Sequence, residues 1–386
     1  MSQKAVKGCS RSDDNDWSQR SEFWRTYSPA GRYPGHRKKY RHREPLILCG
    51  HGLKFRVDHD TLLIRSGFTH YPQNADEIRF FPGDPNIPDR IIVLDGSGGI
   101  TFDALNWMAE QEINFAQLDY RGRVNFICGN SGQSPKPAIV RWQLAIQGTE
   151  TARKIQCQLV EQKLFASIET LQTIFPEFPT TEIAIKQIRR EIDKVRKLPR
   201  SAAYRTILGL EGLAAAAYFK AWHQMPLKWT NLSRRPIPAT WKEIGSRNMN
   251  WQKHGANARH PVNAMLNYGY AVLISQVAID LAANGFDLSI GIAHSGRRNP
   301  RALVYDFMEP QRPIVDRQIL QFALGHKFEP GDFVINKAGA CRINPQLAKA
   351  VTKLVAEAKA QDLTRRAMPA RGGTPLSGLL GFRGQG

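Results

Sequence analysis

Cysteines, long apolar runs and a leader-like N-terminus are scarce or missing in this sequence, and each absence excludes a class of protein. The five cysteines, at positions 9, 49, 128, 157 and 341, form no C-x-x-C pair. That argues against a zinc ribbon or a disulfide framework and suits a reducing compartment. No apolar run approaches the roughly 18 residues that a membrane span needs. The opening MSQKAVKGCSRSDDNDWS lacks the apolar core of a signal peptide. We therefore expect a cytoplasmic protein with no membrane partner.

Acidic residues are also under-represented relative to basic ones. The 386 residues include 54 Lys and Arg but only 34 Asp and Glu, which gives a formal charge of +20. Such an excess predicts a polyanionic partner, held through counterion release and attracted over a distance. Nucleic acid is the first candidate and an anionic membrane the second. Apolar residues make up 42% of the chain, enough for a sizeable core, and the length suggests two or three domains.

The composition and the spacing of apolar residues change along the chain. Residues 1–44 are polar, with a basic run at 37–43, and we expect a flexible extension that is either a solubilising arm or one that lies on phosphates. Short runs with period-two alternation predict a β-rich domain over 45–131. Turn residues predict a linker at 132–140. A helical period predicts a mostly helical domain over 141–363, and a Gly-, Pro- and Arg-rich composition predicts a flexible tail at 364–386.

The expected fold class is therefore α+β, with a small N-terminal β-sheet domain followed by a larger, mostly α-helical domain. The apolar periodicity predicts helices at residues 101–112, 149–175, 181–197, 201–223, 263–283 and 346–361. Thr101 or Asp103 would cap the first of these. The glycines at 96, 98 and 99 lack the spacing of a nucleotide fingerprint and are better explained by a turn between strand and helix.

One helix carries a carboxylate where none is expected. Glu211 stands in the apolar and small-residue row RTILGLEGLAAAAYFKAW. Burying an ionised carboxylate without compensation costs several kcal/mol. Glu211 must therefore be paired, with arginine as the structural candidate, or lie near the surface, or bind a cation.

A second cluster of polar residues lies at 285–316, GFDLSIGIAHSGRRNPRALVYDFMEPQRPIVD. His294 follows a short apolar run, and a helical Asp306-x-x-Glu309 would put both carboxylates on one face. The intervening loop needs only to fold back to bring His294 to them. An imidazole, two carboxylates and nearby arginines suit a divalent ion beside a phosphate. A solvated loop whose arginines pair with these acids is the structural alternative.

Residues 222–260 interleave aromatic and basic side chains. The tryptophans at 222, 229, 241 and 251 alternate with lysines and arginines. Stacking rings among cations are typical of nucleic-acid binding. Core tryptophans beside a surface loop would give the same pattern, and we expect one or two of the four to be core residues.

Three segments together, in this order and spacing, resemble the CRISPR-associated integrase/endonuclease family of spacer acquisition, Cas1 (Cas-one). They are the Leu-Glu-Gly around Glu211, ARHPVNAMLNYGYAVL at 258–273, and GFDLSIGIAH followed by LVYDFMEPQRPIVD. The resemblance covers roughly residues 45–350. It implies a homodimer that works in antiviral defence with double-stranded DNA and the small Cas2 (Cas-two) protein. Leu288 stands where the family has proline and Gln311 where it has an apolar residue.

The resemblance also implies metal-dependent catalysis by the helical domain over 141–363, with a reaction and a set of metal ligands. The ligands would be Glu211, His294 and Glu309, with Asp306 as an added ligand or a supporting partner. Carboxylates and imidazole without a thiolate suit Mg²⁺ or Mn²⁺. The implied reaction is a transesterification that joins the 3′-OH of a captured DNA fragment to the phosphodiester at a CRISPR repeat boundary. With water as the nucleophile, the same site is an endonuclease.

Basic residues near these segments are candidates for contacts with DNA, because planar guanidinium groups pair well with phosphate oxygens. The candidates are Arg259, Arg297, Arg298, Arg247 and Lys253. Two other functions fit the same sequence: a catalytically idle DNA-binding scaffold, and a casposon-type transposon integrase of the same fold. The second usually carries an added C-terminal DNA-binding module, for which residues 364–386 are too few.

Overall fold

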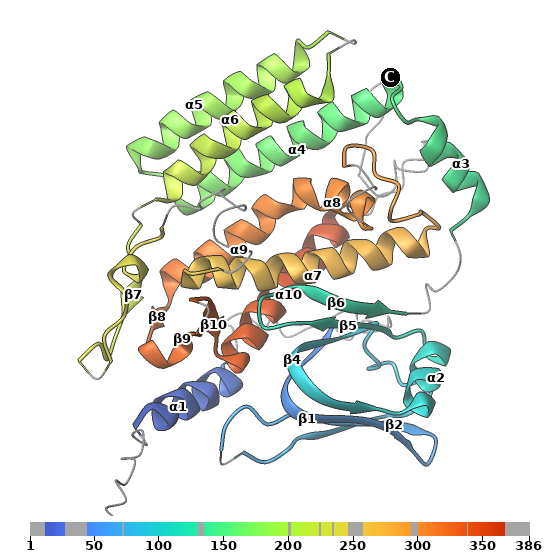
Figure 1. Cartoon of the computed structure of the whole chain (residues 1–386), viewed down its shortest axis with the longest axis vertical. Coiled ribbons are helices and arrows are strands. Elements are labelled where there is room, and N and C mark those ends of the chain that lie inside the picture. Colours follow the sequence, from blue (N-terminus) through green and yellow to red (C-terminus); the bar gives the residue numbers. More distant parts are fainter. Residues whose placement is uncertain are drawn as a thin grey trace, which may run out of the picture.

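The computed structural model describes residues 12–27, 45–71, 73–129, 135–199, 202–223, 225–233, 235–245, 258–294, 300–337 and 339–366. A β-sheet forms one end of the molecule, and layers of helices cover one of its faces (Figure 1). This arrangement confirms the predicted fold class, an N-terminal sheet region followed by a mainly helical region.

Six strands make up the sheet, in the order β3-β2-β1-β4-β5-β6. The central pairs β1–β4 and β4–β5 are parallel, whereas the outer pairs are antiparallel. The strands are β1 (Leu46–Asp58), β2 (Thr61–Arg65), β3 (Glu77–Phe80), β4 (Arg90–Ile100), β5 (Asn114–Leu118) and β6 (Val124–Cys128). Helix α2 (Phe102–Glu110) follows β4, and the Thr101 side chain caps it by accepting from the backbone N–H of Ala104.

The two faces of the sheet pack against different partners. Leu48, Phe55 and Ile64 belong to a small core that includes Trp107 and Met108 of α2. Residues of the opposite face, Ile47, Ile92 and Leu118 among them, belong to the main core of the helical region. Alternation along each strand, with period two, sends neighbouring side chains to these two cores.

Glycines shape the two central strands of the sheet. Strand β1 continues through Gly50 and Gly52, which take positive φ angles, with two register shifts in its pairing with β4. The glycines at 96, 98 and 99 form neither a phosphate loop nor the turn predicted for them, since they lie inside β4. A Cβ on Gly98 would stand 1.9 Å from the carbonyl oxygen of Leu53, so the close approach of β1 requires glycine there.

The helical region begins with α3, which the sequence analysis did not predict. Because α3 starts at Pro137, residues 137–140 are helical and do not belong to a linker. Helices α4, α5 and α6 lie side by side in one layer, and α7 runs between that layer and the sheet (Figure 1). The helices are α3 (Pro137–Ala145), α4 (Glu150–Ile174), α5 (Pro179–Arg196), α6 (Tyr204–Trp222), α7 (Pro261–Ala283), α8 (Ala302–Met308), α9 (Arg312–Gly325) and α10 (Pro345–Arg366).

Short elements connect the long helices. The 3₁₀ turns are η1 (Ala239–Trp241), η3 (Glu309–Gln311) and η4 (Pro330–Asp332). The short strands are β7 (Lys228–Trp229), β8 (Lys327–Phe328), β9 (Phe333–Ile335) and β10 (Cys341–Ile343). Of the helices searched, α7 is long and apolar enough to cross a membrane, and 78% of its most apolar window is buried inside the fold, as in a core helix.

Within residues 1–44, where a flexible extension was expected, residues 12–26 form a docked helix. Helix α1 (Ser12–Thr26) docks near the C-terminal part of the chain. Arg20 donates two hydrogen bonds to the buried carboxylate of Asp332, at 2.7 and 2.9 Å, and Trp24 Nε1 donates a third at 2.7 Å. The signal was missed because these partners are more than 300 residues away along the sequence. The basic run at 37–43 lies outside the described residues.

Two of the tryptophans, at 222 and 241, are core residues, in agreement with the one or two expected, and the partly buried Trp229 packs against the core. Trp222 and Trp241 are each 3% exposed. Trp229 stacks on Trp241, with ring centroids 6.0 Å apart, and its Nε1 donates to the Trp241 carbonyl. Trp222 and Trp241 are therefore not available as a stacking surface for bases. Trp251 lies outside the described residues.

Candidate active site

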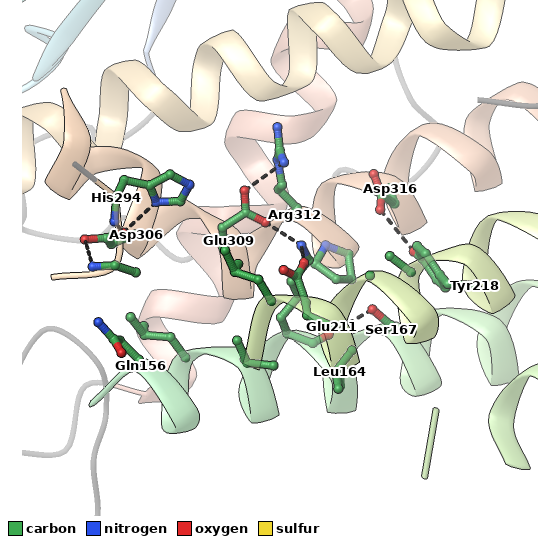
Figure 2. Close-up of a pocket in the computed structure, with 18 of the residues that line it drawn as sticks. Gln156, Leu164, Ser167, Glu211, Tyr218, His294, Asp306, Glu309, Arg312 and Asp316 are labelled. Atoms are coloured by element: carbon green, nitrogen blue, oxygen red, sulfur yellow. Dashed lines mark hydrogen bonds and ion pairs between the residues drawn. The ribbon is translucent and has the colours of Figure 1, made fainter. Parts of the chain in front are cut away.

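A cavity of about 320 Å³ lies among α4, α6, α8, η3 and α9. Glu211, His294, Asp306 and Glu309 all line it, so the fold brings the four predicted site residues to one pocket (Figure 2). Four different elements supply them: α6, the segment before α8, α8 itself and η3.

Two of the acids converge on a lysine. Lys163 of α4 donates from Nζ to Glu211 Oε1 and to Glu309 Oε2, the latter at 2.6 Å. The three side chains are 16–20% exposed. Burial lowers the pKa of Lys163, but the two carboxylates outweigh it and the net pKa is raised. The cation that pairs with Glu211 is therefore a lysine, and not the arginine considered as its structural partner.

A second cation compensates Glu309 from the other side. Arg312, one helical turn further along, donates to Glu309 Oε1 at 2.8 Å, and its guanidinium lies 4.8 Å from the ring centroid of Tyr270. Burial raises the pKa of Glu309, but Arg312 and Lys163 together lower it below its ordinary value. Glu309 is thus held ionised between two positive groups.

Asp306 organises the other half of the pocket. This carboxylate, 1% exposed, accepts from the backbone N–H groups of Ile292, Ala293 and His294 at 2.5, 3.0 and 3.0 Å. It also accepts from Nδ1 of the His294 ring at 2.6 Å. In Figure 2 the ring of His294 lies between Asp306 and Glu309. Because Nδ1 donates to Asp306, Nε2 of a neutral ring is left as a ligand, which is the usual arrangement of metal-binding histidines.

The turn that carries His294 is fixed by close backbone approach and by glutamine side chains. A Cβ on Gly291 would stand 2.4 Å from the His294 carbonyl oxygen and 3.0 Å from Asp306 Oδ2, so only glycine allows the turn to close. Gln143 of α3 donates to the carbonyls of Asp287 and Ile290. Gln147 donates to the Gly291 carbonyl and Gln156 of α4 to that of Ile292.

The negative charge of the site helps to raise the pKa values of two groups, His294 and Tyr204. The hydrogen bond to Asp306 raises the pKa of His294 above its ordinary value, although burial opposes the shift. Burial, with added repulsion from Asp306 and Glu211, raises the pKa of Tyr204, so its hydroxyl stays protonated and can donate to an anion.

Asp306 and Glu309 do follow one another along a helical path, as predicted, but they have separate partners. Asp306 supports His294, whereas Glu309 meets Lys163 and Arg312. Arg259 is exposed and lies outside the pocket. The other candidate DNA contacts lie outside the described residues: Arg247, Lys253, Arg297 and Arg298.

Lys163, Arg312 and Gln156 were not among the predicted site residues, although the sequence carries a signal for the first two. Lys163 lies on the buried stripe of α4, four residues after Leu159 and four before Ser167, both of which are buried. A lysine in such a stripe demands a partner. Arg312 stands three residues after Glu309, the spacing of a helical ion pair.

The types of side chain in the pocket are suitable for binding a divalent metal ion. Two carboxylates and an imidazole oriented through Nδ1 are suitable ligands for Mg²⁺ or Mn²⁺. Among the described residues no group of three or more His, Cys, Asp or Glu side chains is arranged to hold a metal ion. The ammonium of Lys163 lies at the point where Glu211 and Glu309 converge.

Comparison with known proteins assigns the family. The model of the CRISPR associated protein Cas1 family matches residues 85–357, more than half of the chain. The chain belongs to the Cas1 family. A Cas1 relative from Methanobrevibacter ruminantium is 26% identical over 240 residues, which cover 59% of this chain and 65% of the relative. A Cas1 endonuclease from Methanospirillum hungatei is 30% identical over 166 residues, covering 42% and 44%. The chain thus spans less than two thirds of the length of these relatives.

Solved structures share the Cas1 fold. A structure described as a casposase bound to integration product has a TM-score of 0.67 and 22% identity, with 86% of this chain and 85% of that chain covered. A Cas1 protein from Thermotoga maritima has a TM-score of 0.61 and 14% identity, with 82% and 89% covered. At this identity the likeness establishes the fold.

Proposed function

We propose that this Cas1 family member is a spacer-acquisition integrase. It joins the 3′-OH of a captured double-stranded DNA fragment to the phosphodiester at a CRISPR repeat boundary, and it needs Mg²⁺ or Mn²⁺. The observation that carries the proposal is the convergence of Glu211 and Glu309, from two elements far apart in sequence, in a pocket that also holds the His294–Asp306 pair.

The reaction is a transesterification. The 3′ oxygen of the fragment forms a bond to the target phosphorus, the phosphorus–oxygen bond to the departing 3′ oxygen breaks, and that oxygen takes up a proton. With water in place of the hydroxyl, the same site hydrolyses the phosphodiester. A bound divalent ion would polarise the phosphate and lower the pKa of the attacking hydroxyl.

The protein's own residues set up this chemistry. Glu211, Glu309 and His294 would hold the ion. Asp306 fixes the ring orientation of His294 by accepting from Nδ1. Arg312 keeps Glu309 ionised, and the protonated hydroxyl of Tyr204 in the pocket wall can donate to a phosphate oxygen.

The expected partners are double-stranded DNA, a second copy of the chain and the Cas2 protein. The charge of +20 supports a nucleic acid partner, and Arg259 stays a candidate contact because it is exposed. A fold neighbour described as a Cas6-RT-Cas1–Cas2 complex and the casposase structure are consistent with these partners and with integration chemistry.

A catalytically idle DNA-binding scaffold is the second candidate. The ion pairs of Lys163 with Glu211 and Glu309 favour it, because both carboxylates already pair with a cation of the protein and are not open to a metal ion. A strand-transfer assay separates the two functions. Purified protein, with and without Cas2, is mixed with a 3′-OH duplex, a supercoiled plasmid carrying a CRISPR repeat, and Mn²⁺ or Mg²⁺.

Three controls make the assay specific. A 3′-dideoxy duplex removes the nucleophile, and Glu211→Gln and His294→Ala remove candidate ligands. Glu161→Gln, on α4 outside the pocket, makes the same chemical change as Glu211→Gln at a residue that pairs with Arg196. We expect joined product with the wild type and Glu161→Gln only. DNA binding without joining under either metal would establish the scaffold instead.

A further inference from the structure

The strongest unexplained feature of the pocket is Lys163. Its ammonium contacts one carboxylate oxygen from each of two acids that are expected to bind a metal. The side chain is only 16% exposed, and it comes from α4, an element to which the sequence analysis assigned no function. A lysine buried in this manner serves the site in some way beyond solubility.

The charges around Glu211 and Glu309 are already balanced. The two carboxylates carry two negative charges, and Lys163 and Arg312 carry two positive ones. A divalent ion that approached the same oxygens would meet a positive charge within contact distance, and like charges at such range repel strongly in a partly buried site. The ammonium therefore has to leave for the ion to bind.

We propose that Lys163 is a resident cation that holds Glu211 and Glu309 together without metal and competes directly with the divalent ion for them. The inference rests on the proposed metal dependence of the site. A lysine suits this role because its ammonium is a compact charge on a flexible four-carbon stem, which can swing away while the backbone of α4 stays in place.

The displaced ammonium has a natural second partner in the substrate. A DNA phosphate entering the pocket brings negative charge close to Lys163, so the lysine can exchange the carboxylates for the phosphate. DNA would then make room for the metal, and metal would free the lysine for DNA. Coupling of this kind is reciprocal, since each ligand raises the affinity of the other by the same factor.

The test measures Mn²⁺ binding to the full-length protein by electron paramagnetic resonance of the free ion. Lys163→Met keeps the length of the side chain and removes its charge, and we expect it to bind Mn²⁺ at least tenfold more tightly than the wild type. Lys154→Met makes the same change at an exposed position of α4 outside the pocket and should bind like the wild type. Glu211→Gln should weaken binding and so locate the ion.

A thermal melt supplies a second measurement. In chelator, Lys163→Met should melt at a lower temperature than the wild type because its two carboxylates lose their bridging cation. Mn²⁺ should raise its melting temperature more than that of the wild type. Circular dichroism checks the fold, and Lys163→Gln, which keeps a hydrogen-bond donor, replaces Lys163→Met in both measurements if that variant is unfolded.

The outcomes separate this inference from the proposed function. Equal or weaker Mn²⁺ binding by the neutral Lys163 variant, with Glu211→Gln still impaired, overturns the competition by Lys163 and leaves the metal site intact. Absence of Mn²⁺ binding in the wild type and every variant, together with strand transfer in chelator, overturns the metal dependence itself.

Discussion

Asp306→Asn should unfold or loosen the candidate pocket even though the two side chains have the same shape. Asp306 accepts four hydrogen bonds, two on each carboxylate oxygen. An amide keeps one oxygen, so two of the four are lost whichever way the side chain turns, and an NH₂ group then faces two N–H donors. Hydrogen bonds to a charged group contribute about 1.5–3 kcal/mol each. The expected loss in the free energy of unfolding is therefore about 3–6 kcal/mol.

Urea denaturation in chelator measures this loss, and Asp287→Asn in the same segment is the control. Asp287 accepts both of its hydrogen bonds, from Ser289 N and Oγ, on one oxygen, which an amide retains. We expect the control to lose about 1 kcal/mol or less. If Asp306→Asn lost no more than Asp287→Asn, the carboxylate would not be what holds the His294 turn, and the account of the site would be wrong.

Three more predictions rest on contacts in the structure. Arg20→Met should lower the free energy of unfolding in urea by about 3–5 kcal/mol, because Asp332 would keep its buried charge without its main partner. Arg25→Met, at an exposed pair with Glu22, should lower it by about 1 kcal/mol or less, and equal losses for the two variants would contradict this reasoning. The raised pKa of His294 means that the protonated ring stabilises the metal-free fold below about pH 6.5, and that this contribution disappears as the pH rises through the folded pKa. The unfolding free energy of His294→Gln in chelator should therefore fall less than that of the wild type between pH 6 and 8, and parallel curves would refute the shift. Adding DNA should tighten Mn²⁺ binding more in the wild type than in Lys163→Met, as titrations with and without a duplex would show; an equal gain would argue that Lys163 does not couple the two ligands.

Local signals predicted most of the architecture. The helix at residues 149–175 is predictable because apolar residues recur along it at the helical period, and the structure places α4 at Glu150–Ile174, with Thr149 as its cap. Short strands were recognised in the same local way. Helix α1 was missed because its stability comes from Asp332 and Phe322, far away in sequence, and not from its own pattern.

The candidate site was predictable for the residues whose type and surroundings conflict, and hidden for the rest. Glu211 stood out because a carboxylate in an apolar row needs compensation. Lys163 broke the same rule on α4, but nothing in the sequence said that the two helices face each other across a pocket. Which partner a buried charge meets is decided by tertiary packing, and the closeness of Lys163 to Glu309 therefore needed the structure.

The docking of α1 has a consequence for synthesis on the ribosome. Arg20 and its partner Asp332 are 312 residues apart. At about 5–20 residues per second, α1 emerges on the order of 15–60 s before the turn that receives it. During that interval the indole of Trp24, which ends up 2% exposed, has no place to bury itself. Helix α1 is thus made long before it can dock, and the nascent chain must carry an unburied aromatic residue until the segment around Asp332 has been synthesised.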